Sequence, residues 1–402
     1  IKKTLIKLYV YFFKKKIKRN KIILFKTYLG LINENKINLK LKQFPIFFLN
    51  NNSEKKINIK LRDSLKLYFN PNNLFEEFII QDIFKSMPSE FLENYETIEE
   101  YIQKNELPDD PSLIVSTRTL ATDNIFVRYI AKKKEKGCKL IYAQHGGAYG
   151  HIKFSWAEDH EIKISDKYLT WGWNKESKKK VIPFYLMKNI NKFSFKKSNH
   201  INNLCYFVRS RPKYTGRIDS STGSHQMAKY YKNCLNFAKD LKDKNNLNIV
   251  PRFHEAKFEW NHINIWRNNN FNKFSFTDKE SLDQVYKNYE LLIYSYIGTG
   301  FLESLALNKP FILISSLKEW PLRNEVIKDF DHLEKVKIFF KDNKDAKSHL
   351  KKIYNNINDW WDNAETIKVK NYFKEKYARI DINDRRSEHL YNLINNLNNN
   401  EK

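Results

Sequence analysis

The sequence predicts an α/β protein built from two parallel sheets. Short apolar runs rich in β-branched and aromatic residues alternate with longer stretches of helical periodicity. The alternation occurs in two series, which a polar, lysine-rich stretch (188–203) separates. Strands that alternate with helices form parallel sheets with helices on both faces, so each series is expected to be one domain.

The first series contains three predicted strands, at 112–117, 139–144 and 165–172, with a helix through NIFVRYIAKKKEKG after the first. The second series has predicted strands at 203–210, 248–254, 290–296 and 310–315. A long helix around MAKYYKNCLNFAKDLK follows its first strand, and the tail from about Asp359 is expected to be helical. We therefore predict an N-terminal domain over 1–195 with a basic N-terminal extension, a C-terminal domain over 196–358 and a helical tail over 359–402.

The chain has 402 residues and a formal net charge of +26. Lysine is spread over the whole chain, and no zinc-finger or RNA-binding motif accompanies the charge, so we expect no nucleic-acid partner. A basic surface favours anionic partners such as nucleotide sugars, or the anionic face of a membrane. Two interpretations of the lysine- and aromatic-rich N-terminal segment stay open, a peripheral membrane contact and a solvated helix pair.

Three features bear on the cellular compartment. The apolar N-terminal stretch is broken by lysine short of a spanning length, and no small-residue cleavage site follows it. The cysteines show neither a disulfide pattern nor zinc-site spacing: Cys138, Cys205 and Cys234. A reducing, cytoplasmic location is expected, at the inner face of the membrane if the protein contacts one.

The first candidate site directly follows the predicted strand 139–144. The chain has only 10 glycines, yet three of them fall within five residues here. Two adjacent glycines allow a sharp turn that presents His145, and a histidine side chain can take a proton from an acceptor hydroxyl. The other residues of this turn that we predict to belong to the site are Gln144, Gly146, Gly147 and Tyr149. A purely structural turn is the alternative.

An acidic cluster lies shortly downstream, at Glu158, Asp159, His160 and Glu161. One of these residues, by preference Glu158, is predicted to act as a second base or to orient His145. A solvated helix face explains the cluster equally well.

The second candidate site follows the predicted strand 290–296 and reads Gly298-Thr299-Gly300. Backbone N–H groups, a hydroxyl and the positive end of a helix all favour phosphate at such a position. Glu303 lies one turn into that helix and is predicted to accept the hydroxyls of a nucleotide ribose. The alternative is a helix N-cap by Thr299, with Glu303 as an ordinary first-turn carboxylate.

The third group is cationic and lies at the ends of the strands 203–210 and 248–254. We predict that it binds phosphate, because arginine contacts phosphate in a fork geometry that lysine cannot reproduce. Its members are Arg209, Arg211, Arg252 and His254. Ion pairing with surface carboxylates is the alternative. No Asp-x-Asp motif follows a strand, so neither a metal ion nor another cofactor is expected.

Several of these segments resemble a known family. QHGGAYG, SDKYLTWGW, RFHEAKFEW and GTGFLESLALNKP, together with MPSEFLENYETIEEY, are similar to the transferase family found in bacterial surface-carbohydrate gene clusters. The resemblance covers roughly 85–330. The His-Gly and Ser/Thr-Glu-Pro elements are more distantly similar to CDP-glycerol glycerophosphotransferases and capsule Kdo transferases, which have the GT-B fold.

This resemblance implies two Rossmann-like domains facing across a cleft. It implies that His145 belongs to the acceptor-side loop and that Arg252, His254, Thr299 and Glu303 line the donor nucleotide. The predicted function is a metal-independent glycosyltransferase that moves a sugar from a nucleotide-sugar donor to a hydroxyl of a cell-surface polysaccharide or lipid-linked acceptor. A CDP-polyol phosphotransferase, a nucleotide-sugar epimerase or hydrolase, and a non-catalytic scaffold of a polysaccharide assembly complex stay open as alternatives.

Overall fold

A computed structural model describes residues 2–47, 56–104, 107–118, 120, 123–175, 177–188, 201–214, 222–245, 247–254, 258–277 and 279–399. By its internal contacts the chain divides into two compact units. Unit 1 comprises residues 1–143 and 387–402, and unit 2 comprises residues 144–386. The predicted domain boundary at 195/196 lies outside the described residues and stays a prediction.

Unit 1 contains three parallel strands in the order β1-β2-β3: β1 (Ile22–Phe25), β2 (Leu113–Ser116) and β3 (Lys139–Ala143). Ile22 pairs with Leu113, and Leu113 pairs with Lys139. The strands β1 and β2 are buried along their whole length, as expected for parallel strands covered on both faces. The sequence predicted β2 and β3 but not β1, whose four residues give too short a pattern to separate from the lysine-rich segment before it.

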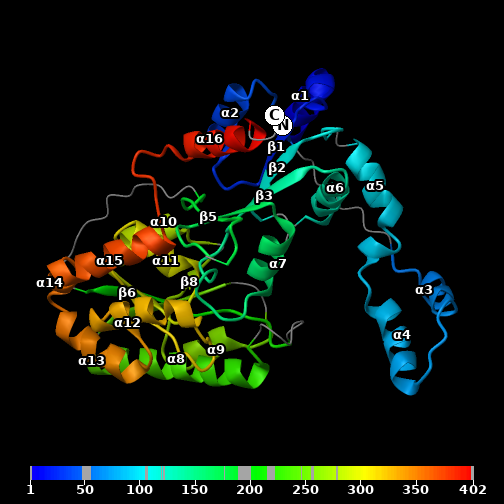
Figure 1. The fold of residues 1–402 in the computed structure, drawn as a ribbon. Coiled ribbons are helices and arrows are strands. Elements are labelled where there is room, and N and C mark those ends of the chain that lie inside the picture. The colour runs from blue at the N-terminus through cyan, green and yellow to red at the C-terminus, as the bar shows by residue number, and fades with distance from the viewer. Residues whose placement is uncertain are drawn as a thin grey trace. The chain divides into compact units, whose positions relative to one another are not determined.

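The helices of unit 1 account for most of its length (Figure 1). They are α1 (Lys2–Ile17), α2 (Leu31–Lys40), α3 (Ile59–Lys66), α4 (Leu74–Ser86), the 3₁₀ turn η1 (Ser89–Phe91), α5 (Tyr95–Lys104), α6 (Asn124–Glu135) and α16 (Arg386–Asn399), most of which lies in unit 1. The Lys40 ammonium of α2 lies 5.2 Å from the ring centroid of Tyr391 in α16, so the C-terminal helix packs against the N-terminal part of the chain.

Unit 2 contains a parallel pair, β4 (Lys167–Thr170) with β5 (Val181–Pro183), and a six-stranded sheet in the order β11-β10-β9-β6-β7-β8. These six strands are β6 (Asn203–Phe207), β7 (Asn248–Phe253), β8 (Ser275–Phe276), β9 (Leu291–Tyr294), β10 (Phe311–Ile314) and β11 (Phe339–Phe340). Every pairing in this sheet is parallel. The predicted strands at 203–210, 248–254, 290–296 and 310–315 are confirmed.

Helices cover both faces of the six-stranded sheet, because successive side chains of a strand point to opposite faces. The helices of unit 2 are α7 (Trp156–Ile164), α8 (Ser224–Asn245), α9 (His262–Arg267), α10 (Leu282–Asn288), α11 (Thr299–Ala306), η3 (Asn324–Val326), α12 (Ile327–Lys335), α13 (Asn343–Ile353), α14 (Ile357–Trp361) and α15 (Ala364–Tyr377). Tyr206 packs on Phe237 of α8 and Trp266 of α9. On the other face, Phe207 packs on Tyr294 and Tyr294 on Phe311. Phe301 of α11 covers Phe311. The predicted α/β class with two parallel-sheet domains is confirmed. The helices α15 and α16 lie within the predicted tail, whose bounds stay a prediction.

Among the described residues, no helix combines the length and the apolar character that a membrane span requires.

Candidate functional site

The two glycine-bearing turns predicted from the sequence lie against each other, and both belong to unit 2. The backbone N–H of Gly147 donates a hydrogen bond to the Thr299 hydroxyl, at 3.1 Å. A Cβ atom on Gly147 would lie 2.5 Å from the carbonyl oxygen of Gly298 and 2.7 Å from the Cα of Thr299. Only glycine permits this approach, since both neighbouring atoms belong to the backbone. The two turns are therefore in direct contact.

Gln144 fixes the start of the first turn. Its buried side-chain oxygen accepts hydrogen bonds from the backbone N–H of Trp171 at 3.0 Å and from the indole of Trp173 at 2.8 Å. Its side-chain nitrogen donates to the carbonyl of Gly146 at 2.7 Å. The Gln144 amide thus holds the turn against the end of β4.

His145 is partly exposed and has a buried carboxylate beside it. Its Nδ1 lies 3.3 Å from Glu161 Oε1, and the side chains are 23% and 4% exposed. The Glu161 carboxylate also accepts hydrogen bonds from the hydroxyls of Tyr149, at 3.1 Å, and Tyr168, at 3.0 Å. Burial raises the pKa of Glu161, while the hydrogen bond from His145 and those from the two tyrosines act in the opposite direction.

This arrangement can polarise the imidazole. Because Nδ1 faces the carboxylate, the proton of a neutral ring is held at Nδ1, and Nε2 is the nitrogen that can accept another. Tyr149 packs edge-on against the His145 ring, with centroids 5.2 Å apart, and restricts its orientation. His145, Glu161 and the two tyrosines therefore have the geometry of a general base with its orienting group.

Glu158, the residue that the sequence analysis preferred for orienting His145, has other partners. Its fully buried carboxylate accepts from the Gly150 backbone N–H at 2.8 Å and lies 2.7 Å from the Arg323 guanidinium. Glu161 is the carboxylate that contacts His145. The sequence could not separate the two, because residues three apart on α7 share one face of the helix and both point inward.

His151 is a residue of this region that sequence reasoning missed. Its buried ring packs against Phe373 and Tyr377, and its Nδ1 is 2.9 Å from the carbonyl of Gly147. Burial lowers the pKa of His151 to about 4, so the ring is neutral at pH 7 and its Nδ1–H donates to that carbonyl. This histidine holds the second glycine of the turn, and only the HGG-x-x-x-H spacing hinted at it.

Two chain segments far apart in sequence meet beside the first turn. Ile152 and Leu322 form an antiparallel bridge, and the backbone N–H of Arg323 donates to the His151 carbonyl at 2.9 Å. The Arg323 side chain then reaches Glu158, as described above. No sequence pattern announced this pairing, since about 170 residues separate its two sides.

Thr299 is the first residue of α11 and Gly298 is its N-cap residue, without a side-chain cap. The Thr299 hydroxyl contacts Gly147 instead of capping the helix. The N–H groups of the first helical turn lack intrahelical acceptors and attract negative charge. A Cβ atom on Gly300 would lie 2.5 Å from the Tyr294 ring, so close packing on β9 is one reason for glycine at this position.

Glu303 is buried in α11 and pairs with Lys188 at 2.7 Å. Burial raises its pKa, and the nearby ammonium opposes that shift. The predicted ribose contact is not tested by this arrangement, and the carboxylate would have to exchange its lysine for the ribose hydroxyls.

The four cationic residues have different surroundings. The Arg209 guanidinium lies 3.7 Å from the Trp320 ring centroid, and no carboxylate of the described residues is within ion-pair distance of it. Arg252 is buried, and its guanidinium is occupied by neighbouring residues of unit 2. It donates to the Glu280 carbonyl at 2.8 Å and to the Ser275 hydroxyl. Burial and the neighbouring charge of Arg211 lower the pKa of Arg209 to about 9. No described carboxylate compensates the positive charge of Arg209.

His254 and Arg211 lie on exposed loops after neighbouring strands. The backbone N–H of His254 donates to the Ser210 hydroxyl at 3.1 Å, which joins the loops after β6 and β7. β6 also pairs with β9, so the carboxyl ends of β6, β7 and β9 lie side by side. Parallel sheets bind ligands at this edge, and Arg209, His254 and Thr299 all follow it.

No group of three or more His, Cys, Asp or Glu side chains suited to a metal ion occurs among the described residues. Metal independence stays a prediction.

Comparison with known proteins identifies a family. The model of the LIC12162 family transferase matches residues 1–390. No curated protein matches the chain. A solved structure assigned as a UDP-N-acetylglucosamine 2-epimerase from Listeria monocytogenes has a TM-score of 0.44 and 8% identity, covering 91% of this chain and 99% of that one. The glycotransferase of kitacinnamycin has a TM-score of 0.39 and 8% identity, covering 77% of this chain and 84% of that one.

Proposed function

Since the chain belongs to the LIC12162 family of transferases, we propose that it transfers a sugar from a nucleotide-activated donor to a hydroxyl group of an acceptor glycan or lipid-linked glycan. One observation carries the proposal: the hydrogen bond between Gly147 and Thr299 joins the turn of a histidine–carboxylate pair to the first turn of α11. A proton acceptor and an anion-attracting helix end thereby belong to one locality, which sugar transfer from a nucleotide requires.

In the proposed reaction, Nε2 of His145 takes the proton of the acceptor hydroxyl as its oxygen bonds to the anomeric carbon. The bond between that carbon and the phosphate oxygen breaks, and the nucleotide leaves with the electron pair. Glu161 stabilises the imidazolium that forms. The first-turn N–H groups of α11 and the uncompensated Arg209 stabilise the negative charge on the departing phosphate, which is usually the largest catalytic contribution.

The acceptor and the location of the reaction remain part of the proposal. The helix α1 has three lysines in its last turn. It also exposes four large apolar side chains: Leu5, Leu8, Tyr11 and Phe12. An amphipathic helix with lysines suits the anionic face of a membrane, where lipid-linked acceptors are found. This supports a surface-polysaccharide acceptor at the cytoplasmic membrane face.

The test compares two histidines. His145→Ala should reduce transfer by about 10²–10⁴-fold, the usual contribution of a general base, and should leave nucleotide affinity nearly intact. His160→Ala is the matched control, because His160 is exposed on the neighbouring helix α7. Equal activity of the two variants would remove His145 from the mechanism.

The donor site needs a separate measurement. Thr299→Ala combined with Glu303→Ala should weaken nucleotide binding, seen as a smaller rise in melting temperature with CMP, CDP, UDP, GDP or dTDP. An unchanged ligand-induced shift would place the donor elsewhere.

A second candidate is phosphotransfer from a CDP-polyol, because a histidine turn in contact with a phosphate-attracting helix end suits phosphoryl transfer equally well. Isotopic phosphorus in the donor separates the two reactions. Sugar transfer leaves the label in the nucleotide, and phosphotransfer moves one labelled group to the acceptor.

A further inference from the structure

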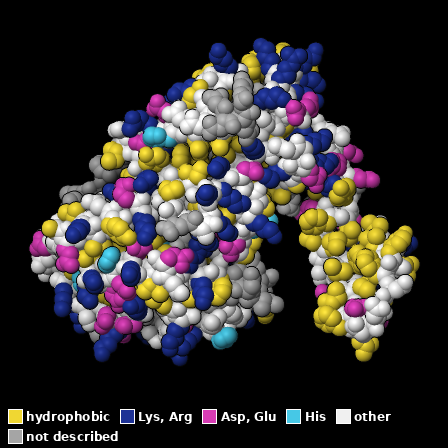
Figure 2. Space-filling view, viewed as in Figure 1, with side chains coloured by type: hydrophobic (Ala, Val, Ile, Leu, Met, Phe, Trp, Pro, Cys, Tyr) yellow, Lys and Arg dark blue, Asp and Glu magenta, His cyan; other side chains and the backbone are white. Residues whose placement is uncertain are grey.

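The helices α3 and α4 and their flanks expose an unusual amount of apolar surface. Figure 2 shows hydrophobic side chains gathered over these two helices. Of the residues within the helices, only Arg62 and Phe84 are buried. Twelve large hydrophobic side chains are between 37% and 84% exposed: Ile57, Ile59, Leu61, Leu67, Tyr68, Phe69, Leu74, Phe75, Phe78, Ile79, Ile83 and Phe91.

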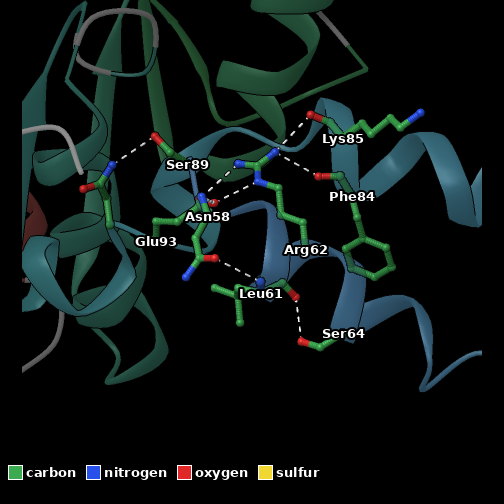
Figure 3. A network of polar contacts seen from close by, with 9 residues as sticks. Asn58, Leu61, Arg62, Ser64, Phe84, Lys85, Ser89 and Glu93 are labelled. Atoms are coloured by element: carbon green, nitrogen blue, oxygen red, sulfur yellow. Dashed lines mark hydrogen bonds and ion pairs between the residues drawn. The ribbon is translucent and has the colours of Figure 1, made fainter. Parts of the chain in front are cut away.

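The two helices form a defined hairpin, because a polar network fixes it from inside (Figure 3). Arg62 makes a two-pronged ion pair with Glu93, at 2.8 and 3.0 Å, and donates to the carbonyl of Phe84 at 2.8 Å. Asn58 and Asn73 cap the starts of α3 and α4 through their side chains. The hydrogen bond from Arg62 lowers the pKa of Glu93 to about 2. The apolar surface therefore belongs to an ordered helical hairpin that its own hydrogen bonds and ion pair hold in place.

The exposed area is large enough for a stable interface. At about 200 Å² for each large side chain, the twelve residues leave on the order of 1,500 Å² accessible. The largest apolar patch of a typical monomer is about 300–600 Å². A standard protein interface buries about 800 Å² on each partner, so half of this surface is sufficient.

The charges on the hairpin distinguish its two helices. The α3 side carries three exposed or half-exposed lysines and one aspartate: Lys56, Lys60, Lys66 and Asp63. The α4 helix has the opposite balance: Glu76, Glu77 and Asp82 against Lys85. In a chain of net charge +26, this neutral hairpin can approach a copy of itself without strong repulsion. Its acidic residues in α4 disfavour insertion into an anionic membrane.

We propose that the hairpin packs against the same hairpin of a second copy of this chain, with α3 of each copy facing α4 of the other. Two-fold symmetry places the same patch on both subunits, so basic α3 meets acidic α4 twice. Four helices packed in this way bury their apolar faces as a four-helix bundle. The proposal is independent of the transfer reaction.

The first experiment measures the mass of the full chain by sedimentation equilibrium. Phe75 in the hairpin and Phe12 in α1 are both 72% exposed, so their serine variants lose equal exposed surface. The unaltered chain should dimerise, Phe75→Ser should raise the dimer dissociation constant by about tenfold or more, and Phe12→Ser should not change it. A chain that stays monomeric at about 100 µM, or equal effects of the two variants, overturns the proposal.

The second experiment tests the orientation by charge reversal. Lys56→Glu with Lys60→Glu should weaken the dimer, as should Glu77→Lys with Asp82→Lys, and the four substitutions together should restore it. Failure of the combined variant to recover rules out the α3-to-α4 pairing. Co-sedimentation with vesicles of phosphatidylcholine and phosphatidylglycerol tests a lipid partner. Binding that Phe75→Ser abolishes in a monomeric chain would assign the hairpin to the membrane and refute self-association.

Discussion

The contact between the two glycine turns can be tested by adding a single methyl group. In Gly147→Ala the new Cβ would lie 2.5 Å from the Gly298 carbonyl oxygen and 2.7 Å from the Thr299 Cα. Neither backbone atom can rotate away, so the turns must separate. In Gly146→Ala the nearest atom is the Thr299 hydroxyl oxygen at 3.7 Å, an ordinary contact. Neither glycine has a positive φ, so the two variants differ in space and not in backbone strain.

The two variants should change the free energy of unfolding in different ways. Overpacking a well-packed contact costs about 1–3 kcal/mol. For a unit of this size each kcal/mol lowers the melting temperature by about 2–4 °C, so Gly147→Ala should lower it by about 2–12 °C. Gly146→Ala restricts the unfolded chain without a clash and should be neutral or stabilising by about 0.4–1 kcal/mol. Separation of the turns should also lengthen the Gly147–Thr299 hydrogen bond and weaken nucleotide binding.

The assay is thermal unfolding of both variants by calorimetry, with and without the nucleotide that gives the largest shift. A fall in melting temperature confined to Gly147→Ala supports the contact. Equal stability and equal nucleotide response of the two variants would refute the reasoning, because then the turns do not touch.

The remaining predictions concern buried carboxylates. Glu161→Gln should impair transfer but keep or raise stability at pH 7, because a carboxylate whose pKa is raised by burial stabilises the fold most when it is protonated. Glu158→Gln should instead lower the free energy of unfolding by about 3 kcal/mol, because it leaves Arg323 without its carboxylate. Calorimetry and activity assays separate the two variants. Transfer should also fall as pH drops through the raised pKa of Glu161. The pKa of Glu93 is lowered from 4.5 to about 2, so its contribution to hairpin stability is complete above about pH 4.5 and is lost as the pH falls through about 2. Hydrogen exchange of α3 should show this loss in the unaltered chain but not in Glu93→Gln, and a pH-independent difference would contradict it.

Much of the fold could be predicted because its signals are local. Each long buried strand of the six-stranded sheet is a short apolar run bounded by polar residues, and β9 was placed to within two residues. The two-residue strands β8 and β11 were not predicted, since so short an element has no periodicity of its own. Their pairing with neighbouring strands defines them.

The candidate site divides in the same way. Scarce glycines after strand ends marked both turns, because close backbone approach excludes every other residue. Which carboxylate faces His145 was not decided locally: Glu158 and Glu161 lie on one side of α7, and their partners come from distant segments. Arg252 lies near the end of β7 and Arg209 follows β6, so their sequence contexts are similar. Arg252 nevertheless pairs with Glu280, whereas Arg209 faces no described carboxylate.

The sequence by itself determined the α/β class, the positions of most strands along the chain, the two glycine turns and the histidine that one of them presents. Only the tertiary structure decided that the turns touch, that Glu161 accompanies His145, and that the α3–α4 hairpin leaves its apolar side chains exposed. The physical reason is the range of each signal. Backbone preference and apolar periodicity act over a few residues, whereas an ion pair or a covered surface depends on which distant segment arrives beside it.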